Sequence, residues 1–369
     1  MTTLTRTAPP GIGRLSPKAW IAAVLLVAGS LVVGLAYGGN QGWLMLVGGA
    51  LGIVLYHASF GFTSAWRVFI TERRGRGLRA QMVMLALAVV LFFPALGAGT
   101  LFGHPVEGFI SPIGISVIVG AFLFGVGMQL GGGCASGTLF TVGGGNARMI
   151  ITLLFFIVGS VIGTAHFAWW QSLPAFQPTS MIDLFGTGGG IAASLVLFAA
   201  IAALTIAMEK RRHGQLEQAP SVSAGPGRWL TGPWPILAGA IGLALLNFLT
   251  LSLAGRPWGI TSAFALWGAK VFQAVGGDVT GWGYWQNPGR AASLDSSIFS
   301  DVTTVMNVGV ILGAGLAATL AGRFAPNFRI PLRSVAAAVI GGLFLGYGAR
   351  LAFGCNIGAY FSGIASGSL

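Results

Sequence analysis

Apolar residues along the chain fall into long runs that are separated by short polar or basic segments. Each run has the length that an α-helix needs to cross the hydrocarbon core of a bilayer, about 17 to 25 residues. The pattern predicts spans at residues 19–37, 43–60, 80–102, 114–133, 148–170, 188–208, 235–254, 301–322 and 334–353. We therefore expect an all-α, polytopic membrane protein with about nine transmembrane helices, forming a single integral membrane domain over residues 1–369.

Positive charge gathers at one end of the predicted helices. With the N-terminus inside, the inner segments hold 16 of the 20 Lys and Arg residues: 1–18, 61–79, 134–148, 209–234 and 323–333. This bias predicts a multi-pass protein of the bacterial inner membrane with a cytoplasmic N-terminus and an outer C-terminus. The basic segment 209–234, which is also rich in Ser, Gly and Pro, is predicted to be a cytoplasmic linker.

Composition narrows the possible partners. The formal charge of +12 sits between apolar runs, whereas a nucleic-acid-binding protein gathers its cations on a polar face, so we expect a lipid bilayer as partner and no nucleic acid. The sequence has no zinc, haem or nucleotide motif, so neither a metal nor a cofactor is expected. Asp301 and Glu209 lie at the ends of predicted spans, which gives little support to a carboxylate proton relay.

Two motifs recur and divide the sequence into two repeats. GFTSAW recurs as GITSAF, and GVGMQLGGGCASGTLF recurs as GYGARLAFGCNIGAYF. The first repeat covers residues 43–143 and the second covers 235–369. An odd number of predicted spans separates their starts, so the repeats should be inverted relative to each other. The four motif segments are too short and too rich in glycine to span, and we predict re-entrant or broken helices that meet near the midplane.

The two cysteines of the chain, Cys134 and Cys355, occupy one repeated position. Glycines can expose backbone amides that bind an anion at a helix N-terminus, and a thiol placed there offers a polarizable donor to a soft sulfur atom. Alternatively, the glycines serve close helix packing and each cysteine is a small buried apolar residue. Two copies at mirrored positions favour a substrate path. Its expected residues around the cysteines are Gly133, Ser136, Gly354 and Asn356.

Hydroxyl groups lie beside the expected helix N-termini of the shorter motif. They belong to Thr63, Ser64, Thr261 and Ser262. These groups either cap helix amides or hydrogen-bond an oxyanion on the path.

Arg350 lies within the last apolar run, where a buried cation is costly and often functional. Its counterpart in the first repeat is the neutral Gln129. The difference predicts a stronger attraction for anions on the outer side, as an importer requires. The alternative is that Arg350 reaches outward to the membrane surface.

These motifs resemble those of the YeeE/YedE membrane family, the sulfur-compound (thiosulfate) transporters. The similarity covers most of the chain and rests on GFTSAWR followed by GRGLRAQ, on GMQLGGGCASGTL and on GYGARLAFGCNIGAYFSGIASGS. It implies an hourglass-shaped protein in which Cys134 and Cys355 pass thiosulfate inward through S–H···S contacts. Some members carry a third cysteine in the motif where this chain has Thr63 and Ser64, so a hydroxyl is expected to replace one step. The resemblance also implies that a small cytoplasmic sulfur-carrier protein is a partner of some members.

The sequence thus predicts a transporter, and not an enzyme, that takes up thiosulfate or a related small sulfur-containing anion. One alternative is transport of a selenium compound. Another is a membrane sulfurtransferase whose cysteines carry a persulfide, which would need thiols of lowered pKa. A third is a structural or regulatory membrane subunit without a path.

Overall fold

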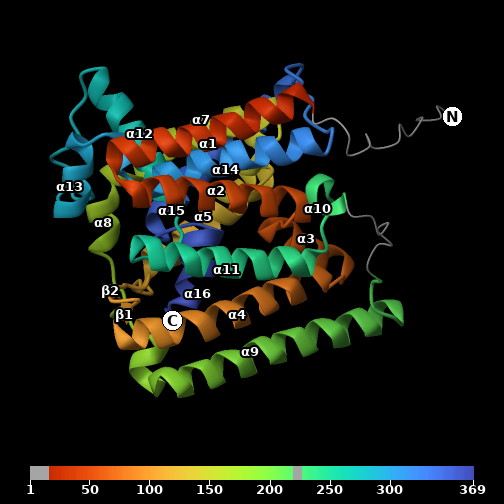
Figure 1. Ribbon diagram of the computed structural model, residues 1–369. Coiled ribbons are helices and arrows are strands. Elements are labelled where there is room, and N and C mark those ends of the chain that lie inside the picture. Colours follow the sequence, from red (N-terminus) through yellow and green to blue (C-terminus); the bar gives the residue numbers. More distant parts are fainter. Residues whose placement is uncertain (1–15, 219–226) are drawn as a thin grey trace.

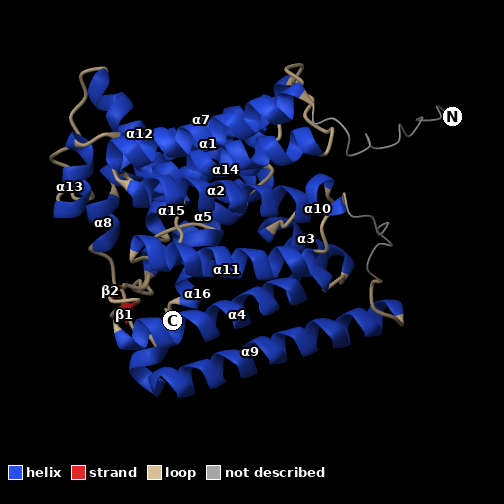
Figure 2. Cartoon of the chain, viewed as in Figure 1, coloured by secondary structure: helices blue, strands red, loops and turns tan. Residues whose placement is uncertain are grey.

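A computed structural model describes residues 16–218 and 227–369 of the chain (Figure 1). Within these ranges almost all of the regular structure is helical (Figure 2), and the strands β1 (Thr100–Leu101) and β2 (His104–Pro105) form one small hairpin. Nine helical stretches of the described residues are long and apolar enough to cross a membrane. The prediction of an all-α, multi-pass membrane protein is confirmed.

The long helices follow the predicted apolar runs. They are α1 (Pro17–Tyr37), α2 (Gly39–Ala58), α4 (Arg76–Ala98), α5 (Ile115–Gly131), α7 (Ala147–Ala165), α9 (Met181–His213), α11 (Ile236–Ala254), α14 (Val302–Leu320) and α15 (Leu332–Leu351). The shorter helices are α3 (Phe62–Glu72), α6 (Ala135–Gly143), α8 (Phe167–Gln171), α10 (Arg228–Thr231), α12 (Thr261–Ala274), α13 (Pro288–Asp295), the 3-10 helix η1 (Ile298–Ser300), the π-helix η2 (Asn356–Ser362) and α16 (Gly363–Ala365).

Helix α9 is longer than its predicted span of 188–208 at both ends. It begins at Met181 and continues to His213, so that it includes the first residues of the predicted linker. Glu209 near its end is fully buried and accepts hydrogen bonds from Arg79 Nη1 at 2.7 Å and from the Gly75 backbone amide at 3.0 Å. The charged and polar partners of this buried carboxylate stabilise the polar end of the helix, so the helix continues beyond the predicted span. Of the predicted linker 209–234, residues 219–226 lie outside the described residues, as does most of the basic segment 1–18.

The helices pack through glycines. Helix α2 runs alongside α14, and a methyl group added at Gly48 or Gly52 would collide with the backbone carbonyl of Met306 or Val310. Small residues allow this close approach of two backbones in lipid. The peripheral helices α1 and α9 lie along opposite edges of the bundle and leave most of their apolar surface uncovered, as lipid-facing helices do (Figure 1).

Helix pairs recur in the packing. Helix α2 packs on α14, α4 packs on α11, and α5 packs on α15. This reciprocal arrangement is what inverted repeats would produce if α2 and α4 were the counterparts of α11 and α14. The division into repeats over 43–143 and 235–369 stays a prediction.

Candidate functional site

Each cysteine lies at a break between a long helix and a short one. Helix α5 ends at Gly131, Gly132 adopts a positive φ of 88°, and Cys134 is the N-cap of α6. In the second segment, α15 ends at Leu351, Phe353 has a φ of 57°, and Cys355 is the N-cap of η2. The recurrence of the motif in the sequence is therefore matched by the same local structure at both cysteines.

The thiols have different partners. Cys134 Sγ lies 3.3 Å from the hydroxyl oxygen of Ser136. Cys355 Sγ accepts a hydrogen bond of 3.4 Å from the Ile357 backbone amide. Both cysteines are buried in one hydrophobic cluster, and α6 contacts η2. The structure thus brings the two cysteine segments together in the interior of the bundle.

The residues that flank the cysteines have unequal surroundings. A methyl group at Gly354 would lie 2.7 Å from the backbone nitrogen of Ala359, so the tight turn before Cys355 requires glycine. At Gly133 the nearest atom, in Met149, would be 3.4 Å away, which is an ordinary contact. The side-chain oxygen of Asn356 is buried and has no hydrogen-bond partner among the described residues, so it could accept a donor.

The hydroxyls of the shorter motif lie in the first turns of α3 and α12 and do not cap these helices, since neither helix has a side-chain cap. Thr63 instead donates to the sulfur of Met128 at 3.1 Å, which connects this motif to α5 a short distance before Cys134. Thr261 is buried.

The two serines of this motif lie on the exposed surface. Ser64 donates to the Gly61 carbonyl at 3.1 Å, and Ser262 donates to Thr303 at 3.0 Å. Their hydroxyls are therefore already engaged away from the cysteines.

Two buried amides, which sequence reasoning did not find, hold the shorter motif at both of its occurrences. Gln81 donates to the carbonyl of Phe62 at 3.4 Å, and Asn307 donates to the carbonyl of Ile260 at 2.9 Å. Phe62 and Ile260 occupy equivalent positions, directly before Thr63 and Thr261. The only signal in the sequence was a single amide residue in the first half of a predicted span.

The accepting oxygens of these amides differ. Gln81 Oε1 accepts a hydrogen bond of 3.2 Å from the hydroxyl of Tyr360, which belongs to the second cysteine segment. Asn307 Oδ1 is buried without a partner within the described parts of the chain, and Leu139 occupies the motif position that corresponds to Tyr360. The Gln81 amide is thus hydrogen-bonded to the second cysteine segment, whereas the Asn307 amide oxygen has no such bond within the described residues.

Arg350 points into the protein and does not reach outward. It is only 6% exposed, and its Nη1 donates to the hydroxyl of Tyr284 at 2.8 Å. None of the ion pairs found among the described residues includes Arg350, and its buried Nε has no partner there. A buried cation without a counter-ion creates a positive potential that an anion can satisfy. Its counterpart Gln129 is exposed on α5.

Tyr284 also contacts a second cation. The guanidinium of Arg290 lies 4.2 Å from the centre of the Tyr284 ring, which is a cation–π distance. Tyr284 comes from the loop between α12 and α13, where neither periodicity nor a motif marks it in the sequence. This tyrosine therefore connects the loop to the buried cation beside the second cysteine segment.

A helical bundle that crosses the membrane many times, with two broken segments and a buried cation in its interior, defines a polytopic membrane transport protein. The chain belongs to the sulphur transport family, whose model matches residues 57–369. It is similar to the thiosulfate transporter TsuA of Spirochaeta thermophila, with 31% identity over 87% of this chain and 90% of the relative.

Two further relatives come from Escherichia coli. The thiosulfate transporter TsuA of strain K12 is 25% identical over 85% of this chain and 84% of its own length. The probable transporter YedE of the same strain is 32% identical over a shorter part, 38% of this chain and 34% of its own length. Similarity to the two TsuA proteins therefore extends over most of the chain.

Proposed function

We propose that this protein takes up thiosulfate, or a related small sulfur-containing anion, across the bacterial inner membrane. The observation that carries the proposal is the pairing of two buried cysteines, each at the N-cap of a short helix, in segments that contact each other. The names of the two TsuA relatives, which cover most of the chain, support thiosulfate as the substrate.

The residues have separate roles along the proposed path. Arg350 attracts the anion at the outer mouth, since it is buried and has no carboxylate partner among the described residues. Cys355 and then Cys134 donate S–H hydrogen bonds to the terminal sulfur, which a soft thiol suits better than a hard donor. The Thr63 hydroxyl, bound to Met128, serves the step for which some family members have a third cysteine. No covalent step is needed for this passage.

The path has to open for transport. Both thiols are buried, and neither of the two described surface cavities is lined by a cysteine. The breaks at 132–134 and 352–355 are the places where the chain leaves helical geometry beside the thiols. We propose that these breaks move while the glycine-packed long helices stay in place.

The proposed orientation places the basic end of the helices in the cytoplasm. Helix α10, the turn between α6 and α7 and the segment 323–333 lie at this end, together with the start of α4. The positive-inside rule then puts the hairpin of β1 and β2 on the outer side. Uptake runs from Arg350 toward this basic end.

Transport can be tested with radiolabelled thiosulfate in proteoliposomes that contain the purified full chain. Cys134→Ala and Cys355→Ala should each lower the initial rate at least tenfold, because each removes one sulfur-matched donor. Ser160→Ala, which changes a buried small residue of α7, is the matched control and should transport like the native chain. Native rates in both cysteine variants would contradict the thiol path.

Two additional readouts separate the alternatives. A persulfide found by mass spectrometry on either cysteine after turnover would indicate sulfur transfer, and transport of a selenium oxyanion in place of thiosulfate would indicate the selenium alternative. Proteoliposomes contain no cytoplasmic protein, so transport there would also be independent of a small sulfur-carrier protein. Growth on thiosulfate of an uptake-deficient bacterium that expresses the chain tests the same function in cells.

A further inference from the structure

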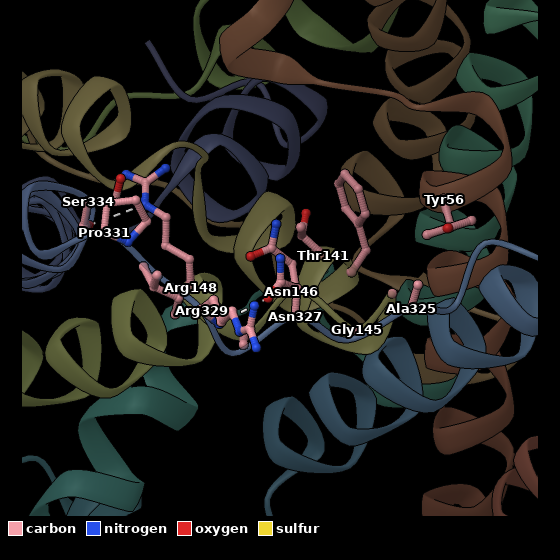
Figure 3. A pocket seen from close by; sticks show the side chains of 14 residues that line it. Tyr56, Thr141, Gly145, Asn146, Arg148, Ala325, Asn327, Arg329, Pro331 and Ser334 are labelled. Atoms are coloured by element: carbon pink, nitrogen blue, oxygen red, sulfur yellow. Dashed lines mark hydrogen bonds between the residues drawn. The ribbon is translucent and has the colours of Figure 1, made fainter. Parts of the chain in front are cut away.

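A cavity of about 460 Å³ opens at the basic end of the helices. It lies between the turn that joins α6 to α7 and the segment that joins α14 to α15. Its lining is formed by Tyr56, Phe140, Thr141, Gly144, Gly145, Asn146, Ala147, Arg148, Ala325, Asn327, Arg329, Ile330, Pro331 and Ser334. Figure 3 shows the side chains of Arg148, Arg329, Asn146 and Asn327 gathered in one part of the cavity, with Tyr56 on the other side.

The charge of this lining is entirely positive. It contains two arginines and neither aspartate nor glutamate, and no ion pair found among the described residues involves Arg148 or Arg329. The remaining polar side chains are hydroxyls and amides. The Thr141 hydroxyl donates to the Gly137 carbonyl, whereas the side-chain amides of Asn146 and Asn327 accept hydrogen bonds through their oxygens, and their NH₂ groups can donate to an oxyanion. Guanidinium groups bind such anions through paired N–H donors. The cavity therefore has the chemistry of an oxyanion site.

Arg148 is held in place by the helices around it. Its Nη2 donates to the Leu130 carbonyl at 2.7 Å and its Nε to the Ser334 carbonyl at 3.4 Å. These bonds position the guanidinium between the end of α5 and the start of α15. They leave Nη1 without a hydrogen bond to any described residue. A fixed guanidinium with a free donor can bind an anion at little entropic cost.

The free donor lies beside the first cysteine segment. A methyl group added at Gly132 would be 3.1 Å from Arg148 Nη1, so glycine at this position makes room for the guanidinium. Helix α6 begins after Cys134, and its last turn contributes Phe140 and Thr141 to the cavity. A helix of this length spans about 13 Å. One end of α6 is therefore at the thiol and the other at the open cavity.

We propose that this cavity is a binding site for small divalent oxyanions, where the substrate rests after it leaves Cys134 and before it enters the cytoplasm. The inference rests on the proposed function, because it takes the basic end as the side of release. No thiol lines the site, so it recognises the anion by its negative charge and not by its sulfur atom. Sulfate should therefore bind here with an affinity similar to that of thiosulfate.

Binding can be measured without transport, by protection of arginines from phenylglyoxal. The full chain is placed in phosphatidylcholine nanodiscs, in which both faces are accessible, and each labelled arginine is quantified by mass spectrometry. Thiosulfate and sulfate should each slow the labelling of Arg329 at least threefold, whereas chloride at equal ionic strength should not. Arg67, an exposed arginine on α3, is the control and should label at the same rate throughout.

A matched pair of variants tests the role in transport. Arg329 lines the cavity, and Arg333 lies outside the lining in the same basic segment. Arg329→Gln should lower thiosulfate uptake at least threefold, Arg329→Lys should restore part of it, and Arg333→Gln should leave it native. Arg148→Gln is a poorer test, since its hydrogen bonds to two carbonyls are also structural.

The outcomes separate this inference from the proposed function. Protection of Arg329 together with a native chain that carries no thiosulfate would sink the proposed function and leave the anion site. Native transport without protection, and with equal rates in Arg329→Gln and Arg333→Gln, would overturn the site alone. Protection by phosphatidylglycerol nanodiscs but not by thiosulfate or sulfate would assign the cavity to a lipid phosphate and would also overturn it.

Discussion

The two cysteine segments share a motif but differ in what surrounds the thiol. Cys134 precedes a regular α-helix and lies beside the Ser136 hydroxyl, whereas Cys355 precedes a π-helix and accepts a backbone N–H from Ile357. Ile357 stands where the first repeat has Ser136, so a side-chain partner is replaced by a backbone partner. Single π-helical turns are frequent at functional sites.

The cations around these segments differ in the same way. Arg350 precedes Cys355 on α15 and is buried, whereas Arg148 follows Cys134 and lies beside an open cavity. Arg350 has no cation at the corresponding position of the first cysteine motif, because Gln129 stands there, and Arg148 lies beyond the motif that recurs. The cysteines thus recur with the motif, whereas the arginines beside them do not.

Replacement of the buried cation Arg350 should have the largest effect on uptake. Arg350→Gln gives the second segment the residue that the first has at position 129, and it removes the charge beside Cys355. We expect uptake to fall about 30- to 100-fold, equivalent to roughly 2–3 kcal/mol. The initial rate of radiolabelled thiosulfate uptake measures this change. Gln129→Ala, at an exposed position, is the control and should be neutral, and an equal loss in both variants would contradict the asymmetry.

Removal of the two buried amides tests whether Gln81, which also accepts from Tyr360, contributes more to stability than Asn307 does. Gln81→Leu and Asn307→Leu each leave the carbonyl before a threonine without its donor, which should lower stability by about 1–2 kcal/mol. Gln81→Leu should cost more, because it also removes the acceptor of Tyr360. Thermal unfolding followed by tryptophan fluorescence would show the order, and a larger loss in Asn307→Leu would reverse the interpretation.

Changes beside the thiols themselves should have the smallest effect. Ser136→Ala removes the hydroxyl next to Cys134, and we expect uptake to fall two- to threefold, or less than about 1 kcal/mol. Ile357→Val keeps the backbone donor of Cys355 and should transport at the native rate. Uptake kinetics of the two variants are compared at matched protein density. A loss in Ser136→Ala alone would indicate that the hydroxyl assists the thiol, and native uptake in both variants would indicate that it serves only in packing.

Much of the fold was predictable because lipid permits few backbone arrangements. A spanning segment must satisfy its own hydrogen bonds, so an apolar run of sufficient length is almost always a helix. The extension of α9 could not be predicted in this way, since it depends on the contact of Glu209 with Arg79, which is distant in sequence.

The candidate site was predictable where the sequence repeats, and at Arg350, which stands out as a cation within an apolar run. Both cysteines were found because they recur in one motif, and the glycine before Cys355 has the close contact that the motif suggests. Arg148 was interpreted only as a topology charge, and Tyr284 was not considered. Their contacts join separate helices or loops, and neither local pattern nor composition encodes such contacts.

Helix α9 has a consequence for the lipid environment. The helix is broken at Gly186, and the part from there to His213 extends over about 40 Å, which exceeds a hydrocarbon core of about 30 Å. One end is fixed to α4 through Glu209. A helix longer than the hydrocarbon core adapts to a thinner bilayer by tilting, by bending or by thickening the lipid around it. Helix α4 also carries Gln81, which contacts both Phe62 and Tyr360. A change in acyl-chain length is therefore expected to reach the two motif segments in the interior through α9 and α4.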